Sequence, residues 1–274
     1  MNKAMRKLAI IGAGNICRQV VGLLAEDCPD SARDSAFSIA VLKRPGSSFQ
    51  GPDDGLVVFS DIHDLLAWQP DLIVEAAGQE AVKQYARLCL ESGRPFLVSS
   101  VGALADDSLY GALLDAARKG NTRMLIPSGA IGGLDYIRSA ALFEGTRVTY
   151  ESRKPPSAWK PELADQGIDS GQLAEELELF AGAADVAATR YPKNLNVAAT
   201  LALAGTGMQD TQVRVVVDPK ASGNQHVIRT NGPAGTFSVT IANRPSPDNP
   251  KTSWIVSRSI VSSIRRYFEP CWIG

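Results

Sequence analysis

The residues with the clearest chemical role are glycines near the N-terminus, in the stretch KLAIIGAGNICRQV at residues 7–20. Gly12 and Gly14 occupy the first two positions of a GxGxxG turn, which joins a strand to a helix and presents backbone N–H groups to a pyrophosphate. Cys17 occupies the third position, where glycine serves close packing of the helix on the strand. We therefore predict a working dinucleotide site and a buried, unreactive Cys17. The N–H groups expected at the phosphates are those of Gly12, Gly14, Asn15 and Ile16.

The second expected strand carries a clue to the cofactor, because it ends in the residues AVLKRPG. An acidic residue at this point would accept hydrogen bonds from the adenosine ribose of NAD, whereas a cation accommodates the 2′-phosphate of NADP. Lys43 and Arg44 stand at this point, which favours acceptance of NADP. Both are equally well read as solvated loop charges, so we expect the cofactor to be NAD or NADP.

The glycine turn needs a scaffold, and up to about residue 145 short runs of Val, Ile and Leu alternate with stretches of helical period. Runs that are apolar on both faces suit a parallel sheet covered by helices on either side. The expected strands are 7–12, 37–42, 56–59, 71–77, 95–100 and 123–128. The expected helices are about 15–26, 61–67, 79–92, 106–119 and 132–143.

The second half of the chain has a different pattern, with strand-like runs separated by turn-rich pieces such as PKASGN and GPAG. A strand is expected at 147–154, and three more at 211–219, 225–232 and 236–244 are expected to form an antiparallel meander. Helices are expected near 173–190, 194–204 and 251–268. The fold class is thus α/β: a Rossmann-type doubly wound parallel sheet plus a second α/β catalytic domain with a mixed or antiparallel sheet.

The domain boundaries follow from this change of pattern. We expect a dinucleotide-binding domain over 1–128, joined by the C-terminal helical segment 249–274, and a catalytic and oligomerisation domain over 129–248. A homodimer is expected, because two-fold dimers are the commonest oligomers.

Composition excludes several classes of function. The formal net charge is −1, which offers no bulk attraction for nucleic acid or an anionic membrane. No apolar run approaches the length of a membrane span and no cleavage-site pattern follows the N-terminus, so we expect a cytoplasmic protein. The four cysteines are scattered and have no histidine at metal spacing, so no metal site is expected.

Five stretches of the sequence make a more specific match. They are PSGAIGGLD at 127–135, RKPPSAW at 153–159, YPKNLNVAATLALAG at 191–205, DPKASGNQHVIRTNG at 218–232 and NPKTS at 249–253. Together they resemble the L-aspartate dehydrogenase family over nearly the whole chain. Cys17 is the visible departure, since the family usually keeps a small residue such as glycine there.

The resemblance implies NAD(P)-dependent oxidative deamination of L-aspartate to iminoaspartate, then to oxaloacetate and ammonia, feeding NAD biosynthesis. It places the active-site histidine at His226, as general acid and base, and cofactor contacts at Ala130 and Asn196. From the residues alone the choice stays open. His226 shares a strand face with Ile228 and Thr230 and either projects into a cleft or lies on an exposed sheet. Ala130 is equally well placed in a tight turn, and Asn196 at a helix start.

An L-aspartate substrate would bring two carboxylates, which need cations or aimed N–H groups in a dry site. Lys193 is the first choice, because a helix begins beside it and adds a favourable dipole. Arg153 and Lys154 follow a strand, and Lys251 with Thr252 opens the last expected helix. Each of these charges is also a plausible solvated residue.

Two other functions fit the same pattern. One is an imine or semialdehyde reductase of the dihydrodipicolinate or homoserine type, which shares the two-part plan. The other is a regulatory module that binds NADP without turnover. Assays with several amino acids would separate these readings.

Overall fold

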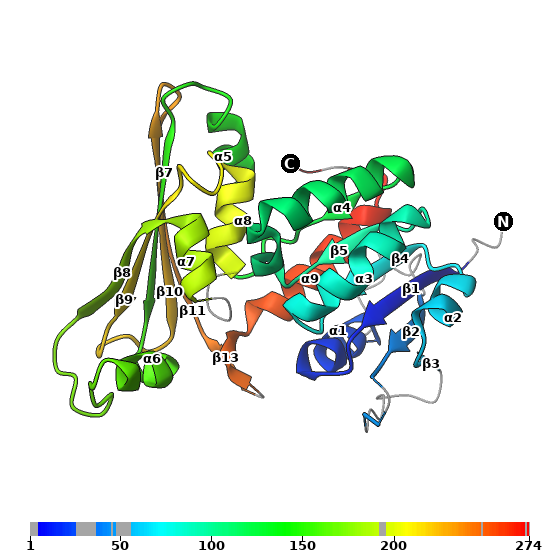
Figure 1. The fold of residues 1–274 in the computed structure, drawn as a ribbon, viewed down its shortest axis with the longest axis horizontal. Coiled ribbons are helices and arrows are strands. Elements are labelled where there is room, and N and C mark those ends of the chain that lie inside the picture. The colour runs from blue at the N-terminus through cyan, green and yellow to red at the C-terminus, as the bar shows by residue number, and fades with distance from the viewer. Residues whose placement is uncertain are drawn as a thin grey trace. The chain divides into compact units, whose positions relative to one another are not determined.

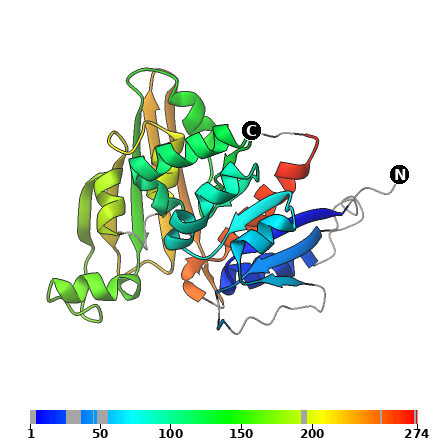
Figure 2. The same cartoon turned by 45° about the vertical axis from the view of Figure 1, so that its right-hand side comes forward.

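A computed structural model gives the fold of the chain and describes residues 5–25, 37–44, 46–47, 56–191, 196–247, 249–271 and 273. The chain forms two compact units (Figures 1 and 2). The first unit lies within residues 1–127 and 257–273, and the second spans 128–256. Residues 249–256, expected with the first domain, are therefore grouped with the second unit.

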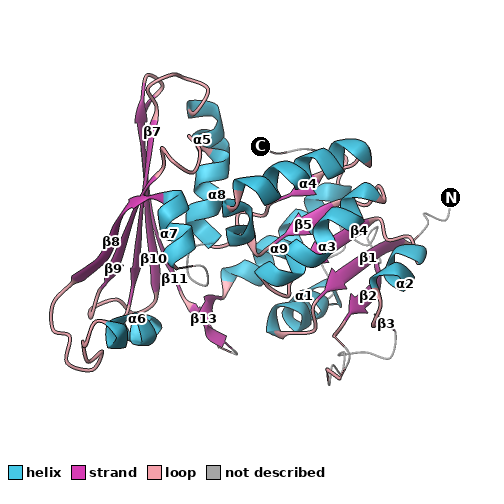
Figure 3. Ribbon diagram, viewed as in Figure 1, coloured by secondary structure: helices cyan, strands magenta, loops and turns pink. Residues whose placement is uncertain are grey.

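The first unit is built on a six-stranded parallel sheet in the order β3-β2-β1-β4-β5-β6 (Figure 3). Its strands are β1 (Arg6–Ile11), β2 (Phe37–Leu42), β3 (Val57–Phe59), β4 (Leu72–Glu75), β5 (Phe96–Val98) and β6 (Met124–Leu125). Its helices are α1 (Asn15–Ala25), α2 (Ile62–Ala67), α3 (Gln79–Glu91), the 3-10 turn η2 (Val101–Ala105) and α4 (Asp107–Lys119). This is the Rossmann order expected from the alternating pattern, and it confirms the predicted fold class.

Burial explains why the strands read as continuous apolar runs. The side chains of β4 are buried without interruption, as are the last four of β1, because helices cover both faces of the sheet. Side-chain caps fix two of the helix starts. Asp61 accepts a hydrogen bond from the N–H of His63 before α2, and Asp106 accepts one from Leu109 at the start of α4.

The last helix, α9 (Ile255–Phe268), packs on the first unit through its C-terminal part. The Phe268 ring packs against Phe37 in a tilted arrangement with ring centroids 5.6 Å apart, and the Arg6 guanidinium lies 4.7 Å from the Phe268 ring centroid. The helix begins at Ile255 rather than 251, because β13 (Asn249–Ser253) pairs with β12 (Pro245–Ser246).

The second unit holds a five-stranded mixed sheet in the order β11-β10-β7-β9-β8. Its strands are β7 (Arg147–Lys154), β8 (Leu177–Ala183), β9 (Gln212–Val217), β10 (Asn224–Gly232) and β11 (Gly235–Asn243). Its helical segments are α5 (Leu134–Ala140), the 3-10 turn η3 (Pro156–Trp159), α6 (Lys160–Asp165), α7 (Ala184–Arg190) and α8 (Asn196–Ala204).

Two expectations for this sheet are wrong. The last three strands do not form a meander, because β7 lies between β9 and β10, parallel to the former and antiparallel to the latter. The stretch 173–190 is not one helix either. Residues 177–183 form β8, which pairs antiparallel with β9, and only 184–190 are helical. Long-range strand pairing overrides the local helical pattern there.

The two faces of this sheet differ strongly in the burial of their side chains. The side chains of Val148, Tyr150, Ser152 and Lys154 are buried, while those between them along β7 are exposed or half-buried. Helices α5, α7 and α8 cover one face (Figure 1). Strand alternation therefore sorts the residues of β7 and β10 into a covered set and an open set.

Candidate active site

The glycine turn after β1 is shaped for close approach by a ligand. Gly12 has φ +115°, and a Cβ at Gly12 would lie 2.8 Å from the carbonyl oxygen of Ala76, so the fold itself requires glycine. A Cβ at Gly14 would meet no described atom within 4 Å, and Gly14 is exposed. Asn15 and Ile16 open α1 directly after this free space. The residues present therefore fit a pyrophosphate at the start of α1.

Cys17, which stands at the third glycine position, is fully buried in α1. Burial raises the pKa of its thiol to about 12, so the sulfur stays protonated and unreactive at neutral pH. Its environment is that of a packing residue.

Lys43 and Arg44 follow β2, the strand next to β1 in the sheet. The Lys43 Nζ donates to the carbonyl oxygen of Ser47 at 3.0 Å, and Arg44 is exposed. The pair therefore stands at the carboxyl end of the strand that meets the adenosine ribose in this fold.

His226 lies on β10 and is 3% exposed. Its side chain is therefore buried and does not lie on an exposed sheet face. It is paired with Ser152 of β7 and Ile241 of β11 in the sheet register. The hydroxyl of Tyr150 lies 2.8 Å from Nδ1, and the two rings stack with centroids 5.9 Å apart. The Nε2 atom is buried and has no hydrogen-bond partner among the described residues.

Burial governs the charge of this histidine. Burial, together with the smaller effect of the nearby positive charge of Lys154, lowers the pKa of His226 to about 4. His226 is thus neutral at pH 7. A neutral imidazole donates from one nitrogen and accepts at the other, so the hydrogen bond with Tyr150 decides the role of Nε2.

Lys154 adds a cation on the same side of β7. It is 7% exposed, and its Nζ lies 5.1 Å from the ring centroid of Trp159. Burial lowers its pKa to about 8, opposed by the carboxylate of Glu162. Because Tyr150, Ser152 and Lys154 alternate along one face, the ammonium belongs to the surroundings of His226.

Arg153 points to the other face of β7 and does not join His226. Its guanidinium binds three carboxylates, with N–O distances of 2.5 Å to Glu151, 2.6 Å to Glu176 and 3.4 Å to Asp218. The strand period of two separates it from Ser152, which pairs with His226. This placement does not support the predicted substrate contact of Arg153.

The other predicted residues are placed as follows. Ala130 is buried in the turn before α5, and its carbonyl oxygen accepts a hydrogen bond of 2.8 Å from the Asn243 side chain. Asn196 is the first residue of α8 and is exposed. Lys193 lies outside the described residues.

The strand β13 carries the remaining pair, Lys251 and Thr252. Of Lys251 only the backbone is described. The Thr252 hydroxyl accepts a hydrogen bond of 3.1 Å from Asn249. The next residue, Ser253, accepts one of 3.1 Å from Asn224 at the start of β10, so β13 lies beside the strand of His226.

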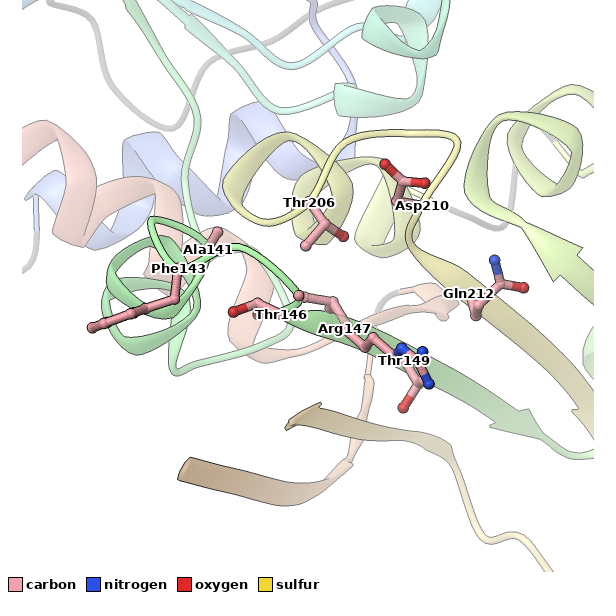
Figure 4. Close-up of a pocket in the computed structure, with 10 residues that line it drawn as sticks. Ala141, Phe143, Thr146, Arg147, Thr149, Thr206, Asp210 and Gln212 are labelled. Atoms are coloured by element: carbon pink, nitrogen blue, oxygen red, sulfur yellow. The ribbon is translucent and has the colours of Figure 1, made fainter. Parts of the chain in front are cut away.

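A separate cavity of about 620 Å³ opens at the other end of β7 (Figure 4). Arg147 and Thr149 of β7 line it together with Thr206 and Asp210, which precede β9. None of the predicted site residues described in the structure lines this cavity, so it is not the candidate active site. In the described part of the chain, no cluster of His, Cys, Asp and Glu is suited to a metal ion, and no helix is long and apolar enough to cross a membrane.

Tyr150 is a candidate site residue that the sequence did not reveal, because it contacts His226 only in the folded chain. Its strand was expected at the correct residues, but which strand lies beside it depends on long-range pairing. The alternation of β7 carries the only local signal, since it places Tyr150 on the buried face.

Comparison with known proteins identifies both units. Residues 12–127 match the family model of the homoserine dehydrogenase NAD binding domain, and residues 135–267 match that of the aspartate dehydrogenase C-terminal domain. The chain is 48% identical over 270 residues to L-aspartate dehydrogenase 2 of Bordetella bronchiseptica, and the matched region covers 98% of this chain and 99% of that protein. It is 37% identical to L-aspartate dehydrogenase of Methanosarcina mazei, over 98% of this chain and 100% of the relative.

Solved structures agree with these relatives. The crystal structure of aspartate dehydrogenase from Thermotoga maritima matches with a TM-score of 0.76 and 27% identity, over 99% of this chain and 100% of that one. A hyperthermophilic archaeal homoserine dehydrogenase in complex with NADPH shares the fold, with a TM-score of 0.59 and 12% identity. The chain therefore belongs to the L-aspartate dehydrogenase family of NAD(P)-dependent oxidoreductases, and its cofactor is NAD or NADP.

Proposed function

We propose that this protein oxidises L-aspartate to iminoaspartate, which is then hydrolysed to oxaloacetate and ammonia. The substrate is supported by the curated relatives, which are named L-aspartate dehydrogenase. The observation that carries the chemistry is the buried pair of His226 and Tyr150, in which Nδ1 is bonded and Nε2 has no partner among the described residues. When bound, the nicotinamide supplies the acceptor for the hydride that leaves the substrate Cα.

Hydrolysis of the imine needs a base for the attacking water and an acid for the departing amine, and we assign both roles to His226. Tyr150 stays a neutral phenol, because burial raises its pKa. Its oxygen is thus able to accept a hydrogen bond from Nδ1–H, which leaves the lone pair of Nε2 for the water proton. The imidazolium formed in this step returns the proton to the amine.

Substrate binding would also change the pKa of His226. In the protein alone the pKa of His226 is about 4, which makes it a weak base. Two substrate carboxylates beside the ring would raise that pKa, because negative charges stabilise the imidazolium. His226 therefore becomes an effective base once the substrate is in place.

The substrate carboxylates need positive partners, and we assign Lys154 to one of them. Its ammonium is buried on the His226 side of β7, whereas Arg153 is committed to carboxylates on the opposite face. Lys193 and the pair Lys251 and Thr252 stay predictions for the second carboxylate.

The cofactor contacts complete the proposal. The N–H groups of Gly12, Gly14, Asn15 and Ile16 hold the pyrophosphate at the start of α1. Lys43 and Arg44 would bind the 2′-phosphate of NADP through their positive charges. Ala130 and Asn196 contact the nicotinamide end, as the family resemblance implies.

The decisive experiment follows NAD(P)H absorbance with L-aspartate, L-homoserine and other amino acids, each with NAD and with NADP. We expect turnover with L-aspartate and with both cofactors. Turnover with L-homoserine and none with L-aspartate would overturn the proposal in favour of a homoserine-type enzyme. No turnover with any amino acid would favour a regulatory module instead.

Assembly as a homodimer and delivery of iminoaspartate to NAD biosynthesis belong to the same proposal. Light scattering during size-exclusion chromatography tests the dimer, and a monomer at enzyme concentrations used in the assay would contradict it.

A further inference from the structure

One buried charge in the first unit has no part in the chemistry proposed above. Glu75 is the last residue of β4 and is fully buried, within a strand that otherwise reads as apolar. Its Oε1 accepts hydrogen bonds from the N–H groups of Ala77 and Gly78, both at 2.7 Å, and from the Ser100 hydroxyl at 2.9 Å. Its Oε2 accepts from the N–H of Ser100 at 2.9 Å. Four donors thus converge on one carboxylate.

These bonds join two loops at one edge of the parallel sheet. Ala77 and Gly78 follow β4, and Ser100 follows β5, the neighbouring strand. The Ser99 hydroxyl adds a bond of 2.7 Å to the carbonyl oxygen of Glu75. Because the carboxyl ends of parallel strands meet at the same edge, both loops lie on the side of the sheet where the glycine turn follows β1.

The loop after β4 is in direct contact with that glycine turn. The N–H of Ala76 donates to the carbonyl oxygen of Ile11 at 2.9 Å. A Cβ at Gly12 would lie 2.8 Å from the Ala76 oxygen and 2.9 Å from the Ala77 Cβ. The order of the sheet reverses between β1 and β4, and ligands of doubly wound folds bind at such a reversal. The glycine turn after β1 and the loop after β4 therefore flank the point where the sheet order reverses.

We propose that Glu75 is a positioning residue of the dinucleotide site, whose carboxylate holds the loops after β4 and β5 at the place where they line the cofactor. This rests on the NAD(P) use of the family. A carboxylate suits the task, because hydrogen bonds to a charged acceptor are roughly twice as strong as neutral ones. Two of the bonded amides lead into α3, whose dipole also favours a negative charge there.

The isosteric variant Glu75→Gln tests the charge. Its NH₂ group must face donors that now meet a carboxylate oxygen, so at least one of the four hydrogen bonds is lost. Ser100→Ala is a milder variant that removes only the hydroxyl donor. The matched controls are Asp71→Asn, which alters a carboxylate bonded to the Lys7 N–H at the other end of β4, and Ser92→Ala, which removes a hydroxyl bond to the Cys89 carbonyl at the end of α3.

The readout is the Kd of NADH and NADPH, titrated by fluorescence with the full chain and no amino-acid substrate, alongside the melting temperature of each variant. We expect a rise in Kd of about ten-fold or more for Glu75→Gln and about three-fold for Ser100→Ala, with both controls within about two-fold of the parent. The KM for L-aspartate at saturating cofactor should change far less than the cofactor Kd.

Folded Glu75→Gln protein with an unchanged Kd would overturn the proposal and leave Glu75 a purely structural role. If Glu75→Gln fails to fold, Ser100→Ala decides, and an unchanged Kd in that variant has the same meaning. Failure of the proposed function is distinguishable, because a chain that does not oxidise L-aspartate can still show the loss of cofactor affinity.

Discussion

The hydrogen bond between Tyr150 and His226 gives the sharpest test of the proposed chemistry. Tyr150→Phe removes the hydroxyl that lies 2.8 Å from Nδ1 and keeps the aromatic ring that stacks on the imidazole. The contact between the Tyr150 hydroxyl and Nδ1 lies in the protein interior, since Tyr150 and His226 are both nearly fully buried. The nitrogen freed by the substitution therefore has no ready replacement partner.

The magnitude follows from this burial. A typical hydrogen bond contributes about 0.5–1.5 kcal/mol net, and an unsatisfied buried polar group costs about 1–3 kcal/mol. The bond strengthens when His226 becomes a cation, so most of the loss falls on the proton-transfer step. We expect a barrier higher by about 1.4–2.7 kcal/mol, which is a fall in kcat of about ten-fold to a hundred-fold.

The assay measures kcat at saturating L-aspartate and cofactor, together with the Kd of NADH. Tyr191→Phe is a matched control, because its hydroxyl donates to the Leu179 carbonyl at 3.2 Å in the same unit and does not touch His226. We expect the control to keep its kcat and both variants to keep the NADH Kd. The chain has two histidines, so NMR titration of the His226 ring, with His63→Ala for assignment, reports the changed environment directly.

A kcat of the Tyr150→Phe protein within about two-fold of the parent would refute the proposal that the Tyr150 hydroxyl bonds Nδ1 of His226 in the working enzyme. A fall of the same size in Tyr191→Phe would attribute the loss to general disruption of the unit.

Three further predictions concern the same unit. His226→Ala should lower kcat by about two to four orders of magnitude with an unchanged NADH Kd, and a weakened Kd in titration would give His226 a structural role instead. Because the folded-state pKa of His226 is lowered from 6.5 to about 4, the unfolded chain binds the extra proton between these values. The free energy of unfolding should therefore fall by about 3 kcal/mol as pH drops through this window, and chemical denaturation of His226→Gln should lack that dependence. Lys154→Met should raise the KM for L-aspartate by about a hundred-fold or more while kcat changes less, and an unchanged KM would remove Lys154 from the substrate site.

The sequence by itself determined the first unit almost completely. Apart from the 3-10 turn η2, the described strands and helices there were predicted to within a few residues, because an alternating pattern of apolar runs and helical stretches is local information. The parallel sheet also followed, since helical stretches between apolar strands favour right-handed crossover connections. Gly12 was readable from its spacing, and the structure adds the reason, which is the nearby carbonyl of Ala76.

Only the tertiary structure decided which residues of the second unit meet. The strand β7 was predicted at its observed residues, yet its place between β9 and β10 depends on pairings between residues far apart in the chain. That place brings Tyr150 to His226 and excludes a meander, and the alternation of β7 puts Lys154 rather than Arg153 on the side of His226. Glu75 shows the same limit in the first unit, because its four donors come from two loops that only the folded sheet brings together. Local pattern indicates most elements and their faces, whereas the partner of each face, and the strand β8 itself, depend on packing over the whole domain.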